Sequence, residues 1–242
     1  MKKMSKISIA IISALSIIIV VLVALLGVAN AKEKKLVKIS KDKVYVKKDN
    51  TKEFTTKLDE NENIVFFGDS ITEIYPLEEI YGKYQIVNSG VSGYETETLL
   101  DNMDSMLYQY NPTKVFLLIG TNDIAHDVSD EVQKETFDNI KKICNEIKQN
   151  RPNAKIYVES VYPVNREMKN DMVGDRTNEA IKKINSNIEN FCKKSKITYI
   201  NMYDELTDKD GNFDEKFTYD GLHPSTLGYA KITKVLTPYV YE

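Results

Sequence analysis

The sequence predicts an α/β fold in which one parallel sheet lies between two layers of helices. Strand-like and helix-like segments alternate from about residue 62 to the end of the chain, and repeated units of this kind form parallel sheets covered on both faces. The strand-like segment at 64–67 is an unbroken apolar run, and the segment at 114–119 is apolar from Val115 onward, as expected of strands buried on both sides. We therefore expect a three-layer α/β/α sandwich with five strands, whose functional residues follow the carboxyl ends of the strands.

The first predicted strand, at 64–67, ends at Gly68, which permits a tight turn. A short helix or loop then extends to about residue 80, and a second strand covers 85–88. The helix expected at about 95–110 has one apolar side, formed by Leu99, Leu100, Met103, Met106 and Leu107.

The third strand, at 114–119, is the most hydrophobic. The helix after it is expected at about 129–150, with Ser129 as a start signal and Pro152 just beyond its end. The remaining strands are expected at 156–160 and 197–201, and the remaining helices at about 176–194 and 225–240.

The N-terminal region differs from the rest of the chain. Residues 7–28 form a nearly continuous apolar run after three lysines, and as a helix this run would be about 33 Å long, enough to cross a bilayer. Its length favours a retained membrane anchor, whereas the small residues at 29–31 favour a signal peptide cleaved after Ala31. We expect a single-pass protein of the cell membrane with an extracytoplasmic domain, or a secreted protein after cleavage.

The sequence predicts that the chain is divided into three parts. Residues 1–31 form the signal-anchor segment, and residues 32–61 form a polar, lysine-rich linker that could contribute an edge strand. Residues 62–242 form the globular domain, which at about 180 residues is large enough for one well-buried core.

The composition argues against nucleic-acid binding. The net charge is -3, and the lysines near 32–48 are interleaved with acidic residues instead of forming a basic stripe. No glycine-rich phosphate loop follows a strand, so nucleotide binding is poorly supported.

The two cysteines, Cys144 and Cys192, lie on the apolar faces of predicted helices, which favours buried free thiols over the alternative of one disulfide. Their spacing suits no metal site.

Four clusters of small or polar residues fall at the predicted ends of strands or before the last helix. A parallel sheet is expected to bring them to one edge. Asp69 and Ser70 alone could simply cap the next helix, so the interpretation depends on the whole set. The clusters are Gly68-Asp69-Ser70, residues 88–93, Gly120-Thr121-Asn122-Asp123, and residues 220–224.

Together the clusters contain the groups that acyl transfer by a serine requires. The Ser70 hydroxyl needs a base to take its proton, and histidine is the side chain best matched to that task near neutral pH. His223 lies three residues after Asp220, so on a tight turn the carboxylate can orient the imidazole. The other histidine, His126, has only Asp123 at a comparable spacing, and we expect it to be a surface loop residue or a substrate contact.

These four blocks, in this order, resemble the SGNH hydrolases, also called the GDSL esterase and lipase family, over about residues 62–242. The resemblance implies a flavodoxin-like sheet and neither a metal nor an organic cofactor. It implies that Ser70, Asp220 and His223 are the catalytic residues, and that Ser70, Gly93 and Asn122 donate to the oxyanion. Gly90 is the alternative to Gly93 in the second block.

The resemblance implies a serine esterase that cleaves carboxylic esters through an acyl-enzyme, and the N-terminal apolar segment favours a substrate at the cell envelope. A short acyl or acetyl ester of a glycan is the favoured substrate, and a lipid is the other candidate. The alternatives are an acyltransferase, a lysophospholipase or thioesterase of the same fold, and a non-catalytic envelope binding protein. The complete set of catalytic residues argues against the last. The sequence does not indicate the acyl specificity or the oligomeric state.

Overall fold

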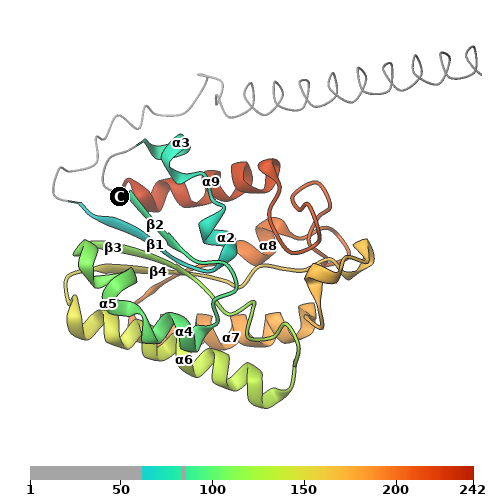
Figure 1. The fold of residues 1–242 in the computed structure, drawn as a ribbon, viewed down its shortest axis with the longest axis horizontal. Coiled ribbons are helices and arrows are strands. Elements are labelled where there is room, and N and C mark those ends of the chain that lie inside the picture. The colour runs from blue at the N-terminus through green and yellow to red at the C-terminus, as the bar shows by residue number, and fades with distance from the viewer. Residues whose placement is uncertain (1–61, 83–85) are drawn as a thin grey trace, which may run out of the picture. The chain divides into compact units, whose positions relative to one another are not determined.

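The computed structural model of the chain describes residues 62–82 and 86–242. Within these residues, five parallel strands form one sheet in the order β2-β1-β3-β4-β5, which is the flavodoxin-like order (Figure 1). The predicted fold class is therefore confirmed. The strands are β1 (Ile64–Gly68), β2 (Ile86–Gly90), β3 (Lys114–Leu118), β4 (Lys155–Glu159) and β5 (Thr198–Ile200).

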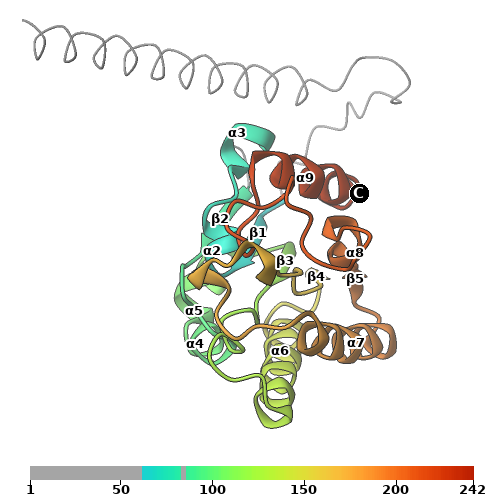
Figure 2. The ribbon, with the colours of Figure 1, turned by 90° about the vertical axis from the view of Figure 1, so that its right-hand side faces the viewer.

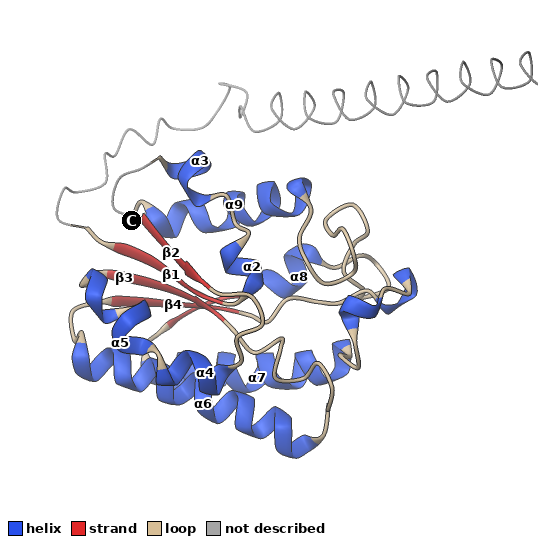
Figure 3. Cartoon of the chain, in the orientation of Figure 1, coloured by secondary structure: helices blue, strands red, loops and turns tan. Residues whose placement is uncertain are grey.

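Helices cover both faces of the sheet, as Figures 1 and 2 show from two directions and Figure 3 shows by element type. One face carries α4 (Thr96–Asp101), α5 (Met103–Met106), α6 (Asp130–Asn150) and α7 (Asn178–Ser195). The other carries α2 (Ser70–Glu73), α3 (Leu77–Tyr81), α8 (Met202–Leu206) and α9 (Thr226–Val240). Three single-turn 3-10 helices lie in the loops: η1 (Tyr108–Tyr110), η2 (Arg166–Met168) and η3 (Asp171–Val173).

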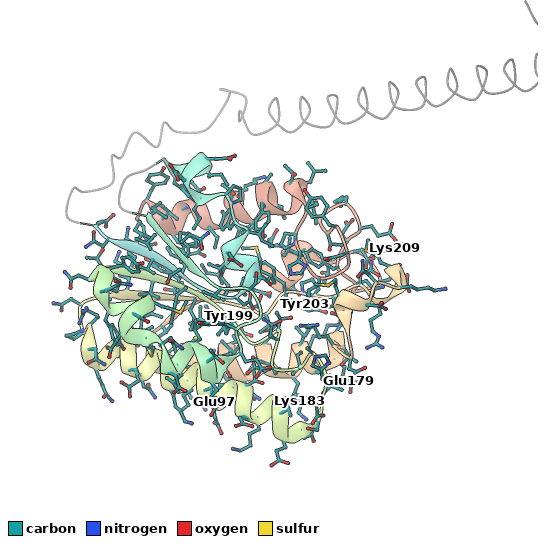
Figure 4. The ribbon with its side chains drawn as sticks, in the orientation of Figure 1. Glu97, Glu179, Lys183, Tyr199, Tyr203 and Lys209 are labelled. Atoms are coloured by element: carbon teal, nitrogen blue, oxygen red, sulfur yellow. The ribbon has the colours of Figure 1, made fainter. Side chains whose placement is uncertain are left out.

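The core consists of two apolar clusters, one on each face of the sheet. On the face of α9, the rings of Phe66, Phe116 and Tyr157 stack across three neighbouring strands with centroids 4.6 Å apart in each pair. Charged side chains such as Glu97 of α4 and Lys183 of α7 lie on the outer sides of their helices (Figure 4). This division of apolar and charged faces fixes which side of each helix meets the sheet.

Lys114 begins β3 at the amino edge of the sheet and is almost completely buried. Its ammonium group donates to the carbonyl oxygen of Val240, at 3.0 Å, and pairs with the carboxylate of Glu62, also at 3.0 Å. The beginning of the described domain and the end of its last helix therefore meet at one buried cation.

The register of the strands aligns their carboxyl ends. Gly68 of β1 lies opposite Gly90 of β2 on one side and Leu118 of β3 on the other. The chain leaves β1 and β3 for opposite faces of the sheet, and in this strand order such a switch point is where ligands bind. The loops after β1, β2 and β3 thus begin at the same level, on the edge where the sequence predicts the functional residues.

Two predicted elements differ from the structure. The single helix expected at 95–110 is broken into α4, α5 and η1, because Asn102 leaves the helical conformation with φ -108° and ψ 15°. The sequence reasoning also missed α8, whose start Asn201 caps by accepting the N–H of Asp204. Cys144 and Cys192 are free and buried, which confirms the favoured interpretation and not the alternative of one disulfide.

The expected signal-anchor segment and the linker, residues 1–31 and 32–61, lie outside the described residues, as does Gln85, where the second strand was expected to begin. Among the helices of the described part, none is both long and apolar enough to cross a membrane.

Candidate active site

Ser70 is the first residue of α2, directly after β1 and the capping residue Asp69. The Asp69 carboxylate accepts the backbone N–H of Ile71 at 2.9 Å. The capping role considered from the sequence is therefore real, but it belongs to Asp69 and leaves the Ser70 side chain free to act. The Ser70 side chain thus stands at the carboxyl edge of the sheet and at the N-terminus of a helix, where backbone N–H groups lack intrahelical acceptors.

Ser70, His223 and Asp220 form a continuous line of side-chain contacts. The Ser70 Oγ atom lies 3.1 Å from Nε2 of His223, and Nδ1 of His223 lies 2.8 Å from Oδ2 of Asp220. Because a carboxylate only accepts, Nδ1 carries the proton and Nε2 is left to accept the serine hydroxyl. The structure therefore brings together the three predicted catalytic side chains from positions 153 residues apart in the chain.

The loop before α9 holds the histidine in place. The second oxygen of Asp220 accepts the backbone N–H groups of Leu222 and His223, at 2.9 and 2.8 Å, and Thr218 donates to the His223 carbonyl oxygen at 2.8 Å. Burial raises the pKa of Asp220, but the N–H groups and the imidazole outweigh it and hold that pKa below its usual value. Asp220 thus remains ionised beside the imidazole.

The second block packs directly against α2. A side chain at Gly90 would meet backbone atoms of Thr72 and Glu73, and its N–H already donates to the Asn88 side chain at 3.1 Å. Gly93 instead has φ +80°, in the left-handed region that favours glycine, and among the described residues its N–H has no hydrogen-bond acceptor. Of the two glycines, Gly93 is the one whose N–H is available to a ligand.

The third block is tied to the second through side chains. The Asn122 amide donates to the carbonyl oxygen of Tyr94 at 3.0 Å, next to Gly93. The neighbouring Asp123 carboxylate accepts the N–H and the hydroxyl of Thr96, where α4 begins. Gly93 and Asn122, the two predicted oxyanion donors besides Ser70, therefore lie on loops that are joined to each other.

His126 is exposed on the loop before α6. The Asp123 carboxylate, which the sequence offered as its partner, is bound to Thr96 instead. Within the described residues, no hydrogen bond or ion pair joins His126 to Asp123, the partner that would have made it a rival base.

Two buried carboxyl groups lie beneath the site. Burial raises the pKa of Asp69 to about 7, against the opposing effects of the Ile71 N–H and the Arg176 charge. Burial likewise raises the pKa of Glu159, at the end of β4, to about 7, although it accepts the Tyr162 hydroxyl at 2.6 Å. The Asp69 charge adds to the rise in the pKa of Glu159, and the Asp123 charge adds to the rise in the pKa of Asp69.

Sequence reasoning missed two residues around the site. The Glu73 carboxylate accepts the N–H of Ser92 at 2.9 Å and also its hydroxyl, which fixes the turn that contains Gly93. Arg176, noted only near a helix start, donates to the Asn122 side chain at 2.9 Å. The first contact joins residues 19 positions apart in the chain and the second joins residues 54 positions apart, so no local pattern in the sequence could have indicated either.

The comparisons with known proteins agree with this arrangement. A family model described as "GDSL-like Lipase/Acylhydrolase family" matches residues 66–231. A solved structure from Streptococcus pneumoniae, provisionally described as a platelet activating factor, is 35% identical with a TM-score of 0.69 and covers 90% of this chain and 99% of its own.

Two curated relatives also match this chain, one at lower sequence identity and one over a smaller part of its own length. The platelet-activating factor acetylhydrolase IB subunit alpha1 of Pongo abelii is 23% identical over 74% of this chain and 75% of its own length. The N-acylneuraminate cytidylyltransferase of Escherichia coli is 30% identical over 72% of this chain, but the match spans only 39% of that protein.

Proposed function

Because this chain belongs to the GDSL-like lipase/acylhydrolase family, we propose that it hydrolyses carboxylic esters by forming an acyl-enzyme on Ser70. The observation that supports this mechanism most is the line of contacts from Ser70 Oγ through His223 to Asp220, at 3.1 and 2.8 Å. A serine in this arrangement has both a base for its proton and a carboxylate that fixes the tautomer of that base.

The proposed reaction has two halves. Ser70 Oγ attacks the ester carbonyl carbon while its proton passes to Nε2 of His223, and the N–H groups of Ser70, Gly93 and Asn122 donate to the resulting oxyanion. The carbon–oxygen bond to the leaving group then breaks, and His223 returns the proton to the departing alcohol. Water repeats the sequence on the acyl-enzyme, which releases the acid and restores Ser70.

Short acyl esters, and acetyl esters of a glycan in particular, are the substrates we propose first. The name of the Pongo abelii relative, an acetylhydrolase, supports the acetyl group. Loss of a single oxyanion donor typically costs on the order of a hundredfold to a thousandfold, so three donors around a small acyl group would supply much of the rate.

An ester with a longer acyl chain or a lipid leaving group is the second candidate, and one observation favours it. Of the large apolar side chains exposed in the described residues, Ile74 follows α2, Tyr219 precedes Asp220, Met172 lies in η3 and Leu227 lies in the first turn of α9. All four are on segments that begin or end near the catalytic edge, where they could contact an apolar substrate.

Hydrolysis of p-nitrophenyl esters from acetate to palmitate by the full-length protein tests the proposal. Ser70→Ala should lower the rate by at least about a thousandfold, whereas Ser105→Ala, which removes an exposed serine hydroxyl on α5, should leave it unchanged. A fluorophosphonate should label the parent on Ser70 and fail to label Ser70→Ala. A Ser70→Ala rate within tenfold of the parent would refute the mechanism, and the chain-length profile separates the two substrate candidates.

We also propose that residues 1–31 direct the domain to the outside of the cell, as a retained anchor or as a signal peptide cleaved after Ala31. The apolar run of the sequence supports this localisation. Mass spectrometry of the N-terminus of the mature protein distinguishes the two forms. Recovery of the uncleaved chain from the soluble cytoplasmic fraction would contradict both.

A further inference from the structure

From the contacts of its guanidinium group, we infer that Arg176 is a positioning residue that orients the Asn122 amide toward the oxyanion. This inference rests on the proposed function, because it concerns one of the three donors assigned there. Arg176 lies at the end of the loop before α7, two residues ahead of the helix, and its side chain comes to Asn122 from a different part of the chain.

The guanidinium group is buried and held on several sides. Arg176 is only 4% exposed. Its Nε atom donates to the Thr121 carbonyl oxygen at 2.7 Å, and Nη2 donates to the Asn122 Oδ1 atom at 2.9 Å. Its Nη1 atom donates to the carbonyl oxygens of Met172 and Val173, both at 3.0 Å. A planar fork held at both ends in this way has no freedom to rotate.

The two contacts of the Asn122 side chain decide which way its amide faces. Oδ1 accepts from Arg176, and Nδ2 donates to the carbonyl oxygen of Tyr94. A flipped amide would place its NH2 group against the guanidinium and its oxygen against the Tyr94 carbonyl, so both contacts would become repulsive. Arg176 and Tyr94 therefore select one orientation from opposite ends of the amide.

That orientation leaves one N–H for the reaction. The Asn122 NH2 group has two donors, and one of them is used by the Tyr94 carbonyl oxygen. Within the described residues the second has no acceptor, and it lies beside the turn that presents Gly93. By holding Oδ1, Arg176 keeps this second N–H from being replaced by an oxygen, which would repel the oxyanion.

A role limited to structure would have a different pattern of effects. Arg176 also fastens the η3 loop through the carbonyl oxygens of Met172 and Val173. If that were its whole contribution, replacing it would weaken the protein or substrate binding whether or not Asn122 was present. If it acts through the Asn122 amide, its replacement should lower kcat, and the effect should vanish once that amide is gone.

A double-mutant cycle in the full-length protein tests this. Asn122→Ala should lower kcat by on the order of a hundredfold or more. Arg176→Met should lower kcat by roughly tenfold or more with little change in KM, but should have almost no further effect in the Asn122→Ala background. Arg176→Lys, which keeps the charge but loses the fork, should recover part of the rate.

Arg151→Met is the matched control, because Arg151 donates to the carbonyl oxygen of Tyr108, far from the catalytic edge, and should leave kcat unchanged. Thermal unfolding establishes that each variant is folded. If Arg176→Met does not fold, the double-mutant cycle is carried out with Arg176→Lys instead. Equal losses from the Arg176 variants in both backgrounds would overturn the inference. If instead Ser70→Ala had no effect on the parent rate, the proposed function itself would fail.

Discussion

Replacing the buried carboxyl of Glu159 with an amide should change how the stability of the protein depends on pH. Glu159 is only 4% exposed, and burial raises its pKa from 4.5 to about 7. In Glu159→Gln the amide oxygen can still accept the Tyr162 hydroxyl, so the substitution mainly removes the ionisable group.

The sign follows from comparing the folded and unfolded chains. The unfolded chain releases the Glu159 proton near pH 4.5, but the folded protein keeps it until about pH 7. Rising pH between these values therefore favours unfolding, and above pH 7 the loss is complete. Since one pH unit corresponds to about 1.4 kcal/mol, Glu159 costs up to about 3 kcal/mol of unfolding free energy at pH 8 and much less at pH 5.

Urea denaturation followed by circular dichroism at pH 5, 6, 7 and 8 measures this effect. Relative to the parent, Glu159→Gln should become more stable by about 2 kcal/mol between pH 5 and pH 8. Glu135→Gln removes an exposed carboxylate from α6 and controls for the loss of one acidic group. A parent-to-variant difference that is the same at pH 5 and pH 8 would show that burial does not keep Glu159 protonated.

Three further substitutions and one labelling experiment test the site and the core. Asp220→Asn should lower kcat by on the order of a thousandfold because the amide favours the wrong imidazole tautomer. Initial rates of ester hydrolysis near the parent value would contradict this. His126→Ala should leave kcat/KM largely intact, and a loss as deep as that of a catalytic variant would make it a rival base. Gly68→Ala should lower the free energy of unfolding by about 2 kcal/mol or more, since its Cβ would lie 2.1 Å from a β3 carbonyl oxygen. An unchanged thermal midpoint would show that the strands can separate. Burial raises the pKa of Cys144 and Cys192, so a thiol reagent should label both only in denaturant, and rapid labelling of the native protein would show that they are reachable.

The elements with strong local signals could be predicted from the sequence. The apolar run of β1 and the capped start of α6 depend on neighbouring residues, and both lie where they were expected. The parallel sheet then placed Ser70 at the same edge as the loop that contains Asp220 and His223, and the residue types at this edge indicated the chemistry.

The remaining features depend on contacts between distant residues. Asn102 ends α4 although the apolar pattern continues past it, because the backbone turns there while the side chains on either side still reach the same core cluster. The link between Arg176 and Asn122 spans 54 residues and becomes visible only when two loops meet. Residues that support a catalytic group from a distant part of the chain are therefore harder to predict from the sequence than the catalytic residues themselves.

The buried ammonium group of Lys114 has a consequence for how the domain can be attached to other structures. It joins Glu62 and Val240 at the amino edge of the sheet, whereas Ser70 lies at the carboxyl edge. A carrier protein or a solid support attached after Val240, or directly before Glu62 in a protein that starts there, would thus lie at the edge of the sheet opposite Ser70 and leave substrate access open. The proximity of Glu62 to Val240 also favours circular permutation of residues 62–242, in which a short peptide joins these two positions and a new start is cut into an exposed loop.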